Sequence, residues 1–341
     1  MRILVTGAAG IVGSETARLL ARDPRFDVVR TVRRRPEPDG GPPTVGWVMG
    51  AEDPPARLRG PWDVIVHTAA STRWTMDRAE ATRANIDTLR AALALATGRT
   101  RFVHVSTAYA DGPGPTDAPG RPEYDGFRNG YEWSKAVGER IVTDSTVGDC
   151  VIVRPPLILG RRSTGMISAF TGPYTLFQAL VSGLAPAVVG TGDGYVEVAP
   201  VDEVAAALGT CCLRPGGGRT EVIAAGRDCL TMGAFLSAFL DEINEWRRRR
   251  GRDPVPFPPI VAPDRWKRLH LPLVREHLSP MQMRATDLLE QFEAYTAMRR
   301  PFEPTFPVAD PAQVVRASTR WWADQVPRRA GHPTEGWLMA P

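Results

Sequence analysis

Two side chains with acid–base chemistry stand four residues apart in the sequence YEWSK of residues 131–135. On an α-helix this spacing places Tyr131 and Lys135 on one face. A phenol ordinarily loses its proton at about pH 10, and an ammonium group close to it favours the phenolate. We therefore expect the pair to do acid–base work on a substrate near neutral pH. Lys135 is one of only two lysines in the chain, so a tyrosine–lysine pair at this spacing would rarely arise by chance.

Hydroxyl side chains follow an apolar segment upstream of this pair. Phe102–Val105 has the length and composition of a β-strand, and Ser106 and Thr107 come directly after it. Ligands of parallel α/β sheets bind at the carboxyl ends of the strands. We expect Thr107 to donate a hydrogen bond to a substrate carbonyl oxygen beside Tyr131. The alternative is that both hydroxyls only satisfy backbone groups of the loop.

A glycine-rich turn lies near the N-terminus, in the sequence TGAAGIVG of residues 6–13. It follows a strand-length run and precedes a helix-length segment, which is the context that a dinucleotide-binding turn requires. Glycines there permit a tight turn and a close approach of the backbone to a pyrophosphate, whose charge the helix N–H groups bind. The residues expected to contact the cofactor are Gly7, Ala9, Gly10, Ile11, Val12 and Gly13.

Three arginines, Arg33–Arg35, stand where the ribose of a dinucleotide is recognised. About twenty residues beyond the turn, an acidic residue would bind the ribose hydroxyls of NAD, whereas an arginine accepts the 2′-phosphate of NADP. The first acidic residue of this loop is Glu37. The sequence therefore predicts NADPH as the cofactor, with Arg33 on the phosphate and Arg34 stacked on the adenine. A merely solvated loop is the alternative.

The composition is that of a folded globular protein. Of the 341 residues, 43% are apolar and 23% are charged, which excludes a disordered, collagen-like or coiled-coil chain. The net charge of +4 comes with no stripe of interleaved basic and aromatic residues, so we expect no nucleic-acid partner. We expect the run Arg247–Arg250 to be a solvated helix end.

No apolar segment approaches the length of a membrane span, and the apolar run at the N-terminus is too short for an export signal. We therefore expect a cytoplasmic location. The four cysteines form no C-x-x-C pair, and the five histidines are scattered along the chain. Because metal sites need clustered ligands, we expect no metal.

Short apolar runs alternate with helix-length segments in the first half of the chain. This alternation predicts an α/β fold with a doubly wound, Rossmann-like parallel sheet. The expected strands are Arg2–Val5, Val28–Val32, Val64–His67, Phe102–Val105 and Val151–Val153. The expected helices are Ile11–Ala21, Ala79–Ala96, Tyr131–Asp144 and Asp202–Leu213, the last capped by Asp202.

The alternation fades after Gly160, where the chain becomes mainly helical. We expect a dinucleotide-binding domain over residues 1–160 with a return segment at 196–228, and a smaller substrate-binding lobe over 161–195 and 229–341. One set of apolar residues at helical spacing in this lobe is expected to form ordinary core; alternatively, it lines an acyl tunnel. Its members are Met281, Ala285, Leu288, Leu289 and Phe292.

These motifs together resemble the extended short-chain dehydrogenase/reductases. The resemblance rests on the glycine-rich turn, Val66–Ala70, Asn85, Ser106–Thr107, the Tyr131/Lys135 pair, Arg154–Pro156 and Pro200–Asp202. The sequence HVSTAY of residues 104–109, followed by Asp111–Gly112, is especially similar to fatty acyl-CoA reductases and to the thioester reductase domains of carboxylic acid reductases and nonribosomal peptide synthetases. Gly226–Phe235 is similar to the segment after the sheet in those reductases, and Tyr295–Phe302 more faintly to the C-terminal region of fatty acyl-CoA reductases.

The resemblance implies a role for each matched residue. Thr107 and Tyr131 would bind the reacting carbonyl oxygen, and Lys135 would contact the nicotinamide ribose and support Tyr131. Asn85 would hold the sheet together. The residues expected to line the cofactor near the nicotinamide are Ala69, Ala70, Pro155 and Pro156.

The resemblance also implies a reaction. NADPH would reduce an acyl thioester, held on coenzyme A or on a carrier protein, to an aldehyde or further to the alcohol. Three alternatives stay open: a ketone or aldehyde reductase, a sugar-nucleotide epimerase, and a protein that binds the cofactor without turnover. A sugar-nucleotide dehydratase is disfavoured, because Ala108–Tyr109 stands where those enzymes carry an Asp–Glu pair. We expect a monomer or a homodimer.

Overall fold

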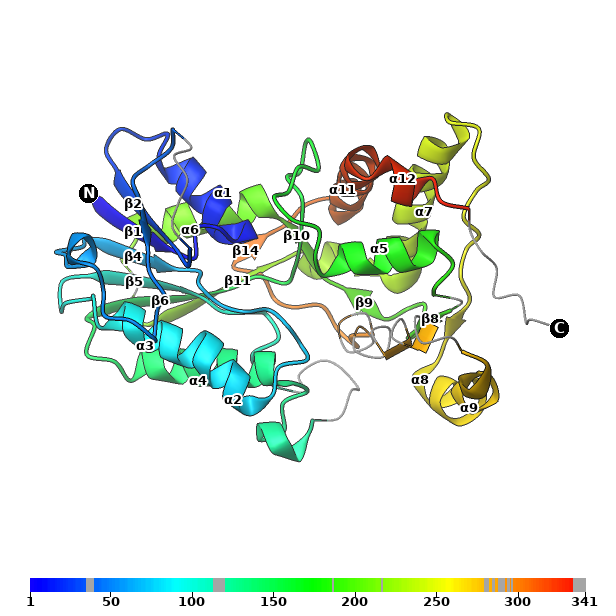
Figure 1. The fold of residues 1–341 in the computed structure, drawn as a ribbon, viewed down its shortest axis with the longest axis horizontal. Coiled ribbons are helices and arrows are strands. Elements are labelled where there is room, and N and C mark those ends of the chain that lie inside the picture. Colours follow the sequence, from blue (N-terminus) through cyan, green and yellow to red (C-terminus); the bar gives the residue numbers. More distant parts are fainter. Residues whose placement is uncertain are drawn as a thin grey trace.

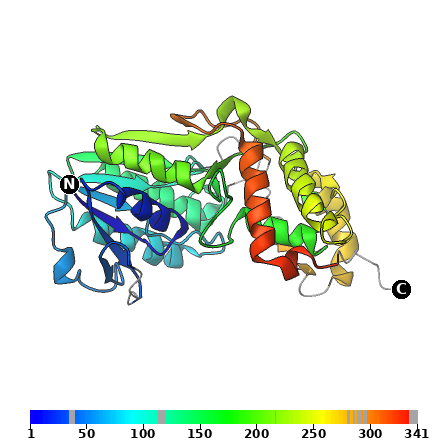
Figure 2. The ribbon, with the colours of Figure 1, turned by 90° about the horizontal axis from the view of Figure 1, so that it is seen from above.

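An eight-stranded parallel β-sheet forms one half of the molecule and a group of helices forms the other (Figure 1). Figure 2 shows the two halves side by side along the longest axis. The computed structural model describes residues 1–34, 40–112, 120–185, 187–215, 217–278, 282–283, 286–287, 292, 295 and 297–333, without the side chains of residues 274 and 277. Arg35 lies outside these residues, as do Met281, Ala285, Leu288 and Leu289.

The sheet has the strand order β14-β11-β6-β5-β4-β1-β2-β3, and all of its neighbouring strands are parallel. Its central strands are continuous apolar runs because helices cover both faces. The strands are β1 (Arg2–Thr6), β2 (Asp27–Val32), β3 (Thr44–Gly46), β4 (Val64–His67), β5 (Arg101–Val105), β6 (Asp149–Arg154), β11 (Arg219–Ala224) and β14 (Phe306–Pro307). The predicted fold class is confirmed.

Helices α1 and α6 cover one face of the sheet, and α2, α3 and α4 lie along the other (Figure 1). Their bounds are α1 Ile11–Leu20, α2 Arg78–Ala81, α3 Asp87–Leu93, α4 Gly130–Thr143 and α6 Val201–Leu213. The helix predicted over Ala79–Ala96 is interrupted by a π-helical turn, Thr82–Ile86, between α2 and α3. Such turns are frequent at functional sites, and this one contains Asn85.

The second half of the molecule is built around packed aromatic rings. Phe177 of α5 stacks on Phe239 of α7 with ring centroids 4.3 Å apart, and Trp322 of α11 meets Phe177 edge-on. The helices there are α5 (Pro173–Val181), α7 (Met232–Arg248), α8 (Pro263–Arg265), α9 (Leu271–Val274), α11 (Pro311–Gln325) and α12 (Pro327–Ala330), with a π-helical turn at Trp266–His270.

Short elements complete the fold. The two-stranded pairs are β7 (Leu157–Leu159) with β10 (Val198–Pro200), β8 (Val188–Val189) with β13 (Ile260–Val261), and β9 (Tyr195–Val196) with β12 (Leu230–Thr231). The 3-10 turns are Ala56–Leu58, Pro122–Tyr124, Gly226–Asp228 and Arg275–His277. The division into two domains stays a prediction; β14, which comes from the segment expected in the helical lobe, pairs with β11 at the sheet edge.

The predicted cap of α6 is wrong. The N-cap position is Pro200, and Asp202 lies inside the first turn, where its carboxylate accepts the backbone N–H of Arg162 at 3.0 Å. The carboxylate therefore fastens the loop after β7 instead of capping its own helix.

The expectation of a solvated helix end is wrong for Arg247. Its side chain is buried and donates to the carbonyl oxygens of Asp253 at 2.5 Å, Ala330 at 2.7 Å and His332 at 3.0 Å. The end of α7 thus holds the C-terminal part of the described chain, because a guanidinium can bond several carbonyls at once.

The glycine-rich turn packs against the residues that follow β4. Gly7 adopts a φ of +67°, and a Cβ there would lie 2.6 Å from the Cα of Ala69. A Cβ on Gly13 would overlap the Gly7 carbonyl and lie 2.5 Å from Thr68 Oγ1. Thr68 donates to the Thr6 carbonyl at 2.6 Å and ties the two segments together. The turn has this shape only with glycine at both positions.

This packing predicts that Gly13→Ala destabilises the protein, because the added methyl group meets backbone atoms that have no room to move. We expect a loss of about 1–3 kcal/mol in the free energy of unfolding, together with weaker binding of the dinucleotide that the turn is expected to hold. Chemical denaturation and a fluorescence titration measure the two effects. Gly98→Ala is the matched control, since its methyl group would meet nothing within 4 Å. Equal losses in the two variants would contradict this account of the turn.

Candidate active site

The N-terminus of α1 offers an anion site beside the glycine-rich turn. Gly10 precedes the helix in an extended conformation and no side chain caps the first turn. The first N–H groups of a helix have no partner inside the helix and attract negative charge. Ala9 and Gly10 are exposed, and Ile11 and Val12 are half-buried. The open helix end and the space that a Cβ at Gly7 or Gly13 would fill fit the pyrophosphate of a dinucleotide.

The loop after β4 forms the next wall of this site. Ala69 and Ala70, both expected to line the cofactor, are half-buried there. Asn85 holds the loop through Ser71, accepting its N–H at 2.7 Å and donating to its carbonyl at 3.1 Å. The Asn85 amide also donates to Ser134 Oγ at 2.8 Å. Asn85 therefore joins this loop to α4, rather than holding the strands of the sheet to one another.

Thr107 is fixed at the carboxyl end of β5, as the sequence predicts. The backbone on both sides of it pairs with the chain after β6: Ser106 N–H donates to Val153 at 2.8 Å, and Ala108 N–H donates to Pro155 at 2.9 Å. The Thr107 side chain is buried and hydrogen-bonds that of Tyr131. The structure thus brings together the two hydroxyls expected to bind the reacting oxygen.

Tyr131 stands in the first turn of α4 and is half-buried. Burial raises the pKa of its phenol to about 12, the hydrogen bond with Thr107 lowers it, and the charge of Glu132 raises it further. The prediction that a neighbouring ammonium brings this pKa down is wrong for the described side chains. Tyr131 therefore stays protonated at neutral pH.

Lys135 lies one turn further along α4 and points at the sheet. Its Nζ donates to the carbonyl of Val105, the last residue of β5, at 2.8 Å. Burial lowers the pKa of this ammonium to about 8, and the carboxylate of Glu139 opposes the change. Lys135 is thus held under the Ser106–Thr107 loop, close to its charge transition at neutral pH.

A row of buried polar side chains crosses the sheet under the site. The two histidines among them have no role predicted from the sequence. Thr6 Oγ1 and His67 Nδ1 are 2.9 Å apart, and the rings of His67 and His104 stack with centroids at 5.6 Å. Neither ring nitrogen of His104 has a hydrogen-bond partner in the part of the chain that the structure describes. Burial lowers the pKa of His67 to about 3 and that of His104 far below its usual value, with Lys135 acting in the same direction. Both rings are neutral.

The remaining predicted contacts lie at the rim of the same site. Arg33 and Arg34 follow β2 and are exposed, so both guanidinium groups are open to a ligand. Pro155 and Pro156 follow β6 and are buried. The register of the sheet aligns Thr6 with His67 and His67 with His104, which puts the ends of β1, β4 and β5 level.

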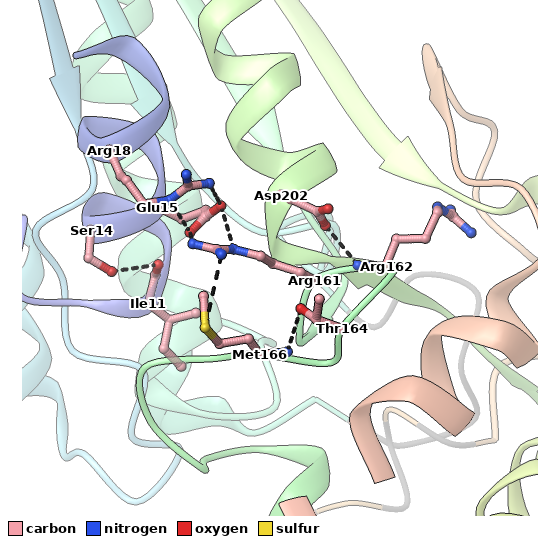
Figure 3. A network of polar contacts seen from close by, with 9 residues as sticks. All are labelled: Ile11, Ser14, Glu15, Arg18, Arg161, Arg162, Thr164, Met166 and Asp202. Atoms are coloured by element: carbon pink, nitrogen blue, oxygen red, sulfur yellow. Dashed lines mark hydrogen bonds and ion pairs between the residues drawn. The ribbon is translucent and has the colours of Figure 1, made fainter. Parts of the chain in front are cut away.

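An ion-pair network fastens the loop after β7 to α1 (Figure 3). Arg161 donates to both oxygens of Glu15, at 2.9 and 2.7 Å, and Arg18 donates to the same carboxylate at 3.1 Å. Burial alone would raise the pKa of Glu15, but the hydrogen bonds from the two arginines lower it. The loop is therefore held beside the helix whose N-terminus forms the anion site.

A cavity of about 420 Å³ lies on a different side of α4. Glu139, Arg140 and Arg154 line it, whereas Thr107, Tyr131 and Lys135 do not. Arg154 donates to Glu139 at 2.8 Å and to Asp111 at 2.8 Å. Because none of the three candidate catalytic residues lines it, the cavity is separate from the candidate site.

Within the described ranges, no three His, Cys, Asp or Glu side chains gather as metal ligands would. No helix among the residues that the structure describes is both long and apolar enough to cross a membrane.

Comparisons with known proteins find a matching family model and a shared fold. Residues 52–208 match the family model for NAD-binding domains described as male sterility protein. No curated protein matches the sequence. The matched segment runs from before β4 into α6 and contains the loop after β4, Thr107, Tyr131 and Lys135.

Solved structures share the fold over nearly the whole chain. The terminal R domain of the myxalamid PKS-NRPS pathway superposes with a TM-score of 0.72 at 19% identity, covering 98% of this chain and 92% of that one. A thiolation-reductase di-domain from an archaeal nonribosomal peptide synthetase has a TM-score of 0.67 at 16% identity, covering 96% and 76%. The UDP-glucuronic acid 4-epimerase of Bacillus cereus, in complex with NAD, has a TM-score of 0.60 at 17% identity, covering 95% and 99%.

The fold and the site define a nicotinamide-dinucleotide-binding protein of the Rossmann type. Residues 52–208 carry a nucleotide-binding segment that matches the male sterility family model, and the whole chain has the fold of the reductase domains and epimerases named above. The resemblance drawn from the sequence is confirmed.

The buried ammonium of Lys135 predicts a pH dependence of stability. Between about pH 8, its pKa in the folded protein, and its ordinary value of 10.5, the unfolded chain still binds the proton that the folded chain has released. The free energy of unfolding of the unmodified protein therefore rises with pH over this window, and Lys135→Met removes the rise. Denaturant unfolding at several pH values measures it. Lys267→Met, at an exposed lysine, is the control; parallel profiles for the unmodified protein and Lys135→Met would contradict the burial argument.

Proposed function

We propose that the protein uses NADPH to reduce an acyl thioester to an aldehyde. The acyl group would be held on the phosphopantetheine thiol that coenzyme A and carrier proteins share. The observation that carries the proposal is the hydrogen-bonded pair of Thr107 and Tyr131 at the carboxyl end of β5, level with the glycine-rich turn. Two hydroxyls converge there on the place where a reacting carbonyl oxygen is expected.

NADPH, when bound, supplies the hydride. The first-turn N–H groups of α1 would hold its pyrophosphate, Arg33 its 2′-phosphate and Lys135 its nicotinamide ribose. Gly7 and Gly13 leave the space that its close approach to the backbone requires. Ala69, Ala70 and Pro155 would line the nicotinamide end. Arg34 would cover the adenine.

The chain's own part in the reaction is to stabilise charge and deliver a proton. A thioester carbon that accepts a hydride leaves negative charge on its oxygen, and donors fixed beforehand stabilise this charge more than the neutral carbonyl. Tyr131 gives its proton to that oxygen, and Thr107 holds the oxygen in place. The resulting thiohemiacetal loses its carbon–sulfur bond, so the thiol departs with a proton and the aldehyde remains.

The similarity to reductase domains of thioester-handling assembly lines supports this choice of substrate. The archaeal structure joins a thiolation domain to its reductase domain, and the R domain of the myxalamid pathway has the higher TM-score of the two. The fold also occurs in sugar-nucleotide epimerases. A protonated Tyr131 with a pKa of about 12 favours reduction, because that direction consumes a proton at this residue.

The substrate proposal predicts that thiol release and NADPH oxidation occur together in equal amounts. A thiol-reactive dye and the absorbance of NADPH, followed in parallel, measure both products with acyl-CoA and with carrier-bound acyl chains of several lengths. Comparing the rates with acyl-CoA and with carrier-bound acyl chains identifies the preferred acyl donor. NADPH oxidation with aldehydes or ketones alone, and no thiol from any thioester, would replace this proposal with a carbonyl reductase.

Tyr131→Phe is the control for the same assay. The variant keeps the ring and removes the proton donor, so turnover falls by roughly 10² or more while NADPH still binds. Near-normal turnover of this variant would show that the proton comes from another group.

The exposed arginines predict the cofactor preference. Arg33→Glu replaces a partner of the 2′-phosphate with a like charge, so the ratio of kcat/KM for NADPH over NADH should fall about tenfold or more. Arg99→Glu changes the same charge at an exposed position away from β2 and should leave the ratio unchanged. Equal kcat/KM for the two cofactors in the unmodified enzyme would overturn the NADPH assignment.

A further inference from the structure

A buried ion pair lies directly beside Tyr131, and the chemistry proposed above does not use it. Glu132 is 0% exposed and Arg128 is 7% exposed. The guanidinium of Arg128 donates to Glu132 Oε2 at 2.9 Å and lies 2.8 Å from Oε1. Charges are buried at a large cost in solvation, so this pair needs further partners to be stable.

One of those partners comes from the C-terminal part of the chain. Tyr295 donates its hydroxyl to Glu132 Oε1 at 2.5 Å and accepts from Asn129 Nδ2 at 2.8 Å. Its ring stacks on Trp74 with centroids 4.3 Å apart and meets Tyr109 edge-on at 4.7 Å. Tyr295 therefore joins the loop after β4, the loop after β5 and the start of α4.

This cluster encloses the first turn of α4 on both sides of Tyr131. Asn129 is the N-cap of the helix, and its Oδ1 accepts the backbone N–H of Glu132 at 3.0 Å. The side-chain amide of Asn129 also donates a hydrogen bond to the Tyr295 hydroxyl. The first turn of α4 is thus fixed at its N-cap, Asn129, and at Glu132, the residue after Tyr131. The Tyr131 side chain therefore has little freedom to change direction.

The charges of the cluster also act on the phenol of Tyr131. Glu132 faces Arg128, Tyr295 and Tyr109, while Tyr131 faces Thr107 and Glu132. Burial raises the pKa of Glu132, and the hydrogen bonds from Arg128 and Tyr295 oppose that rise. Its carboxylate in turn raises the pKa of Tyr131.

We propose that Glu132 and Tyr295 are positioning residues: through the cap and first turn of α4 they hold the Tyr131 hydroxyl against Thr107, with the Glu132 carboxylate beside it. The proposal rests on the proposed function for its effect on turnover, but not for its effect on the phenol. It makes the C-terminal segment, far from the glycine-rich turn in sequence, a part of the site. Phe292 of the same segment lies edge-on to Trp74 at 4.8 Å and extends the contact.

A titration of phenolate absorbance tests the charge without any substrate. The chain has six tyrosines, so Tyr131 is isolated by subtracting the curve of the matched Tyr131→Phe variant. In the unmodified protein only about a tenth of Tyr131 should be phenolate at pH 11, one unit below its pKa of about 12. In Glu132→Gln, which removes the carboxylate and leaves Arg128 charged, the midpoint should fall by about one pH unit or more. Identical Tyr131 curves in the two backgrounds would overturn the role of Glu132.

The effect of position is tested in turnover. Tyr295→Phe removes one hydroxyl, and we expect kcat to fall about tenfold or more with little change in the KM for NADPH. Tyr174→Phe, at another buried tyrosine whose hydroxyl accepts the Gly160 N–H at 3.0 Å, is the matched control and should keep its kcat. An unchanged kcat in Tyr295→Phe would overturn the role of Tyr295. If no thioester or carbonyl compound is reduced by the unmodified protein, the proposed function fails, while the same titration of Glu132→Gln and of Tyr295→Phe still decides whether the two residues act on Tyr131.

Discussion

The candidate site depends on one close contact, the packing of the glycine-rich turn against the chain that follows β4. Gly7 and Gly13 leave no Cβ between the turn and Thr68–Ala69. The turn therefore lies flat on the end of β4, and the open N-terminus of α1 is brought to the carboxyl edge of the sheet. Because the ends of β1, β4 and β5 are level, this edge gathers an open helix N-terminus, the loop after β4 and a fixed hydroxyl in one place.

The chemistry at that edge follows from burial. Burial keeps the Tyr131 phenol protonated and brings the Lys135 ammonium close to its charge transition. Two neutral histidines lie beneath Lys135, so the sheet side of the site adds no second positive charge. A site with a protonated phenol, a fixed hydroxyl and room for a dinucleotide is suited to reducing a carbonyl group, since the oxygen gains charge as the hydride arrives.

Most of the fold and the first set of site residues could be predicted from the sequence, because both rest on local patterns. Strands, helices and the glycine-rich turn have short-range signals. Thr107 follows the carboxyl end of a parallel strand, where such sheets bind ligands, and Tyr131 and Lys135 have the spacing of one helix face. The effect of burial on Tyr131 and the buried role of Arg247 depend on distant segments and left no local signal. Tyr295 and Glu132 are 163 positions apart in the sequence, so no local spacing of residues predicts their contact.

The most direct test of the central claim is to follow the hydride itself. NADPH carrying deuterium at both C4 positions is incubated with the protein and a thioester, and the products are examined by mass spectrometry. Reduction of the thioester predicts an aldehyde with one deuterium on its carbonyl carbon and one equivalent of NADP⁺ and thiol. Recovery of the acyl thioester without deuterium, with the deuterated NADPH intact, would contradict the account.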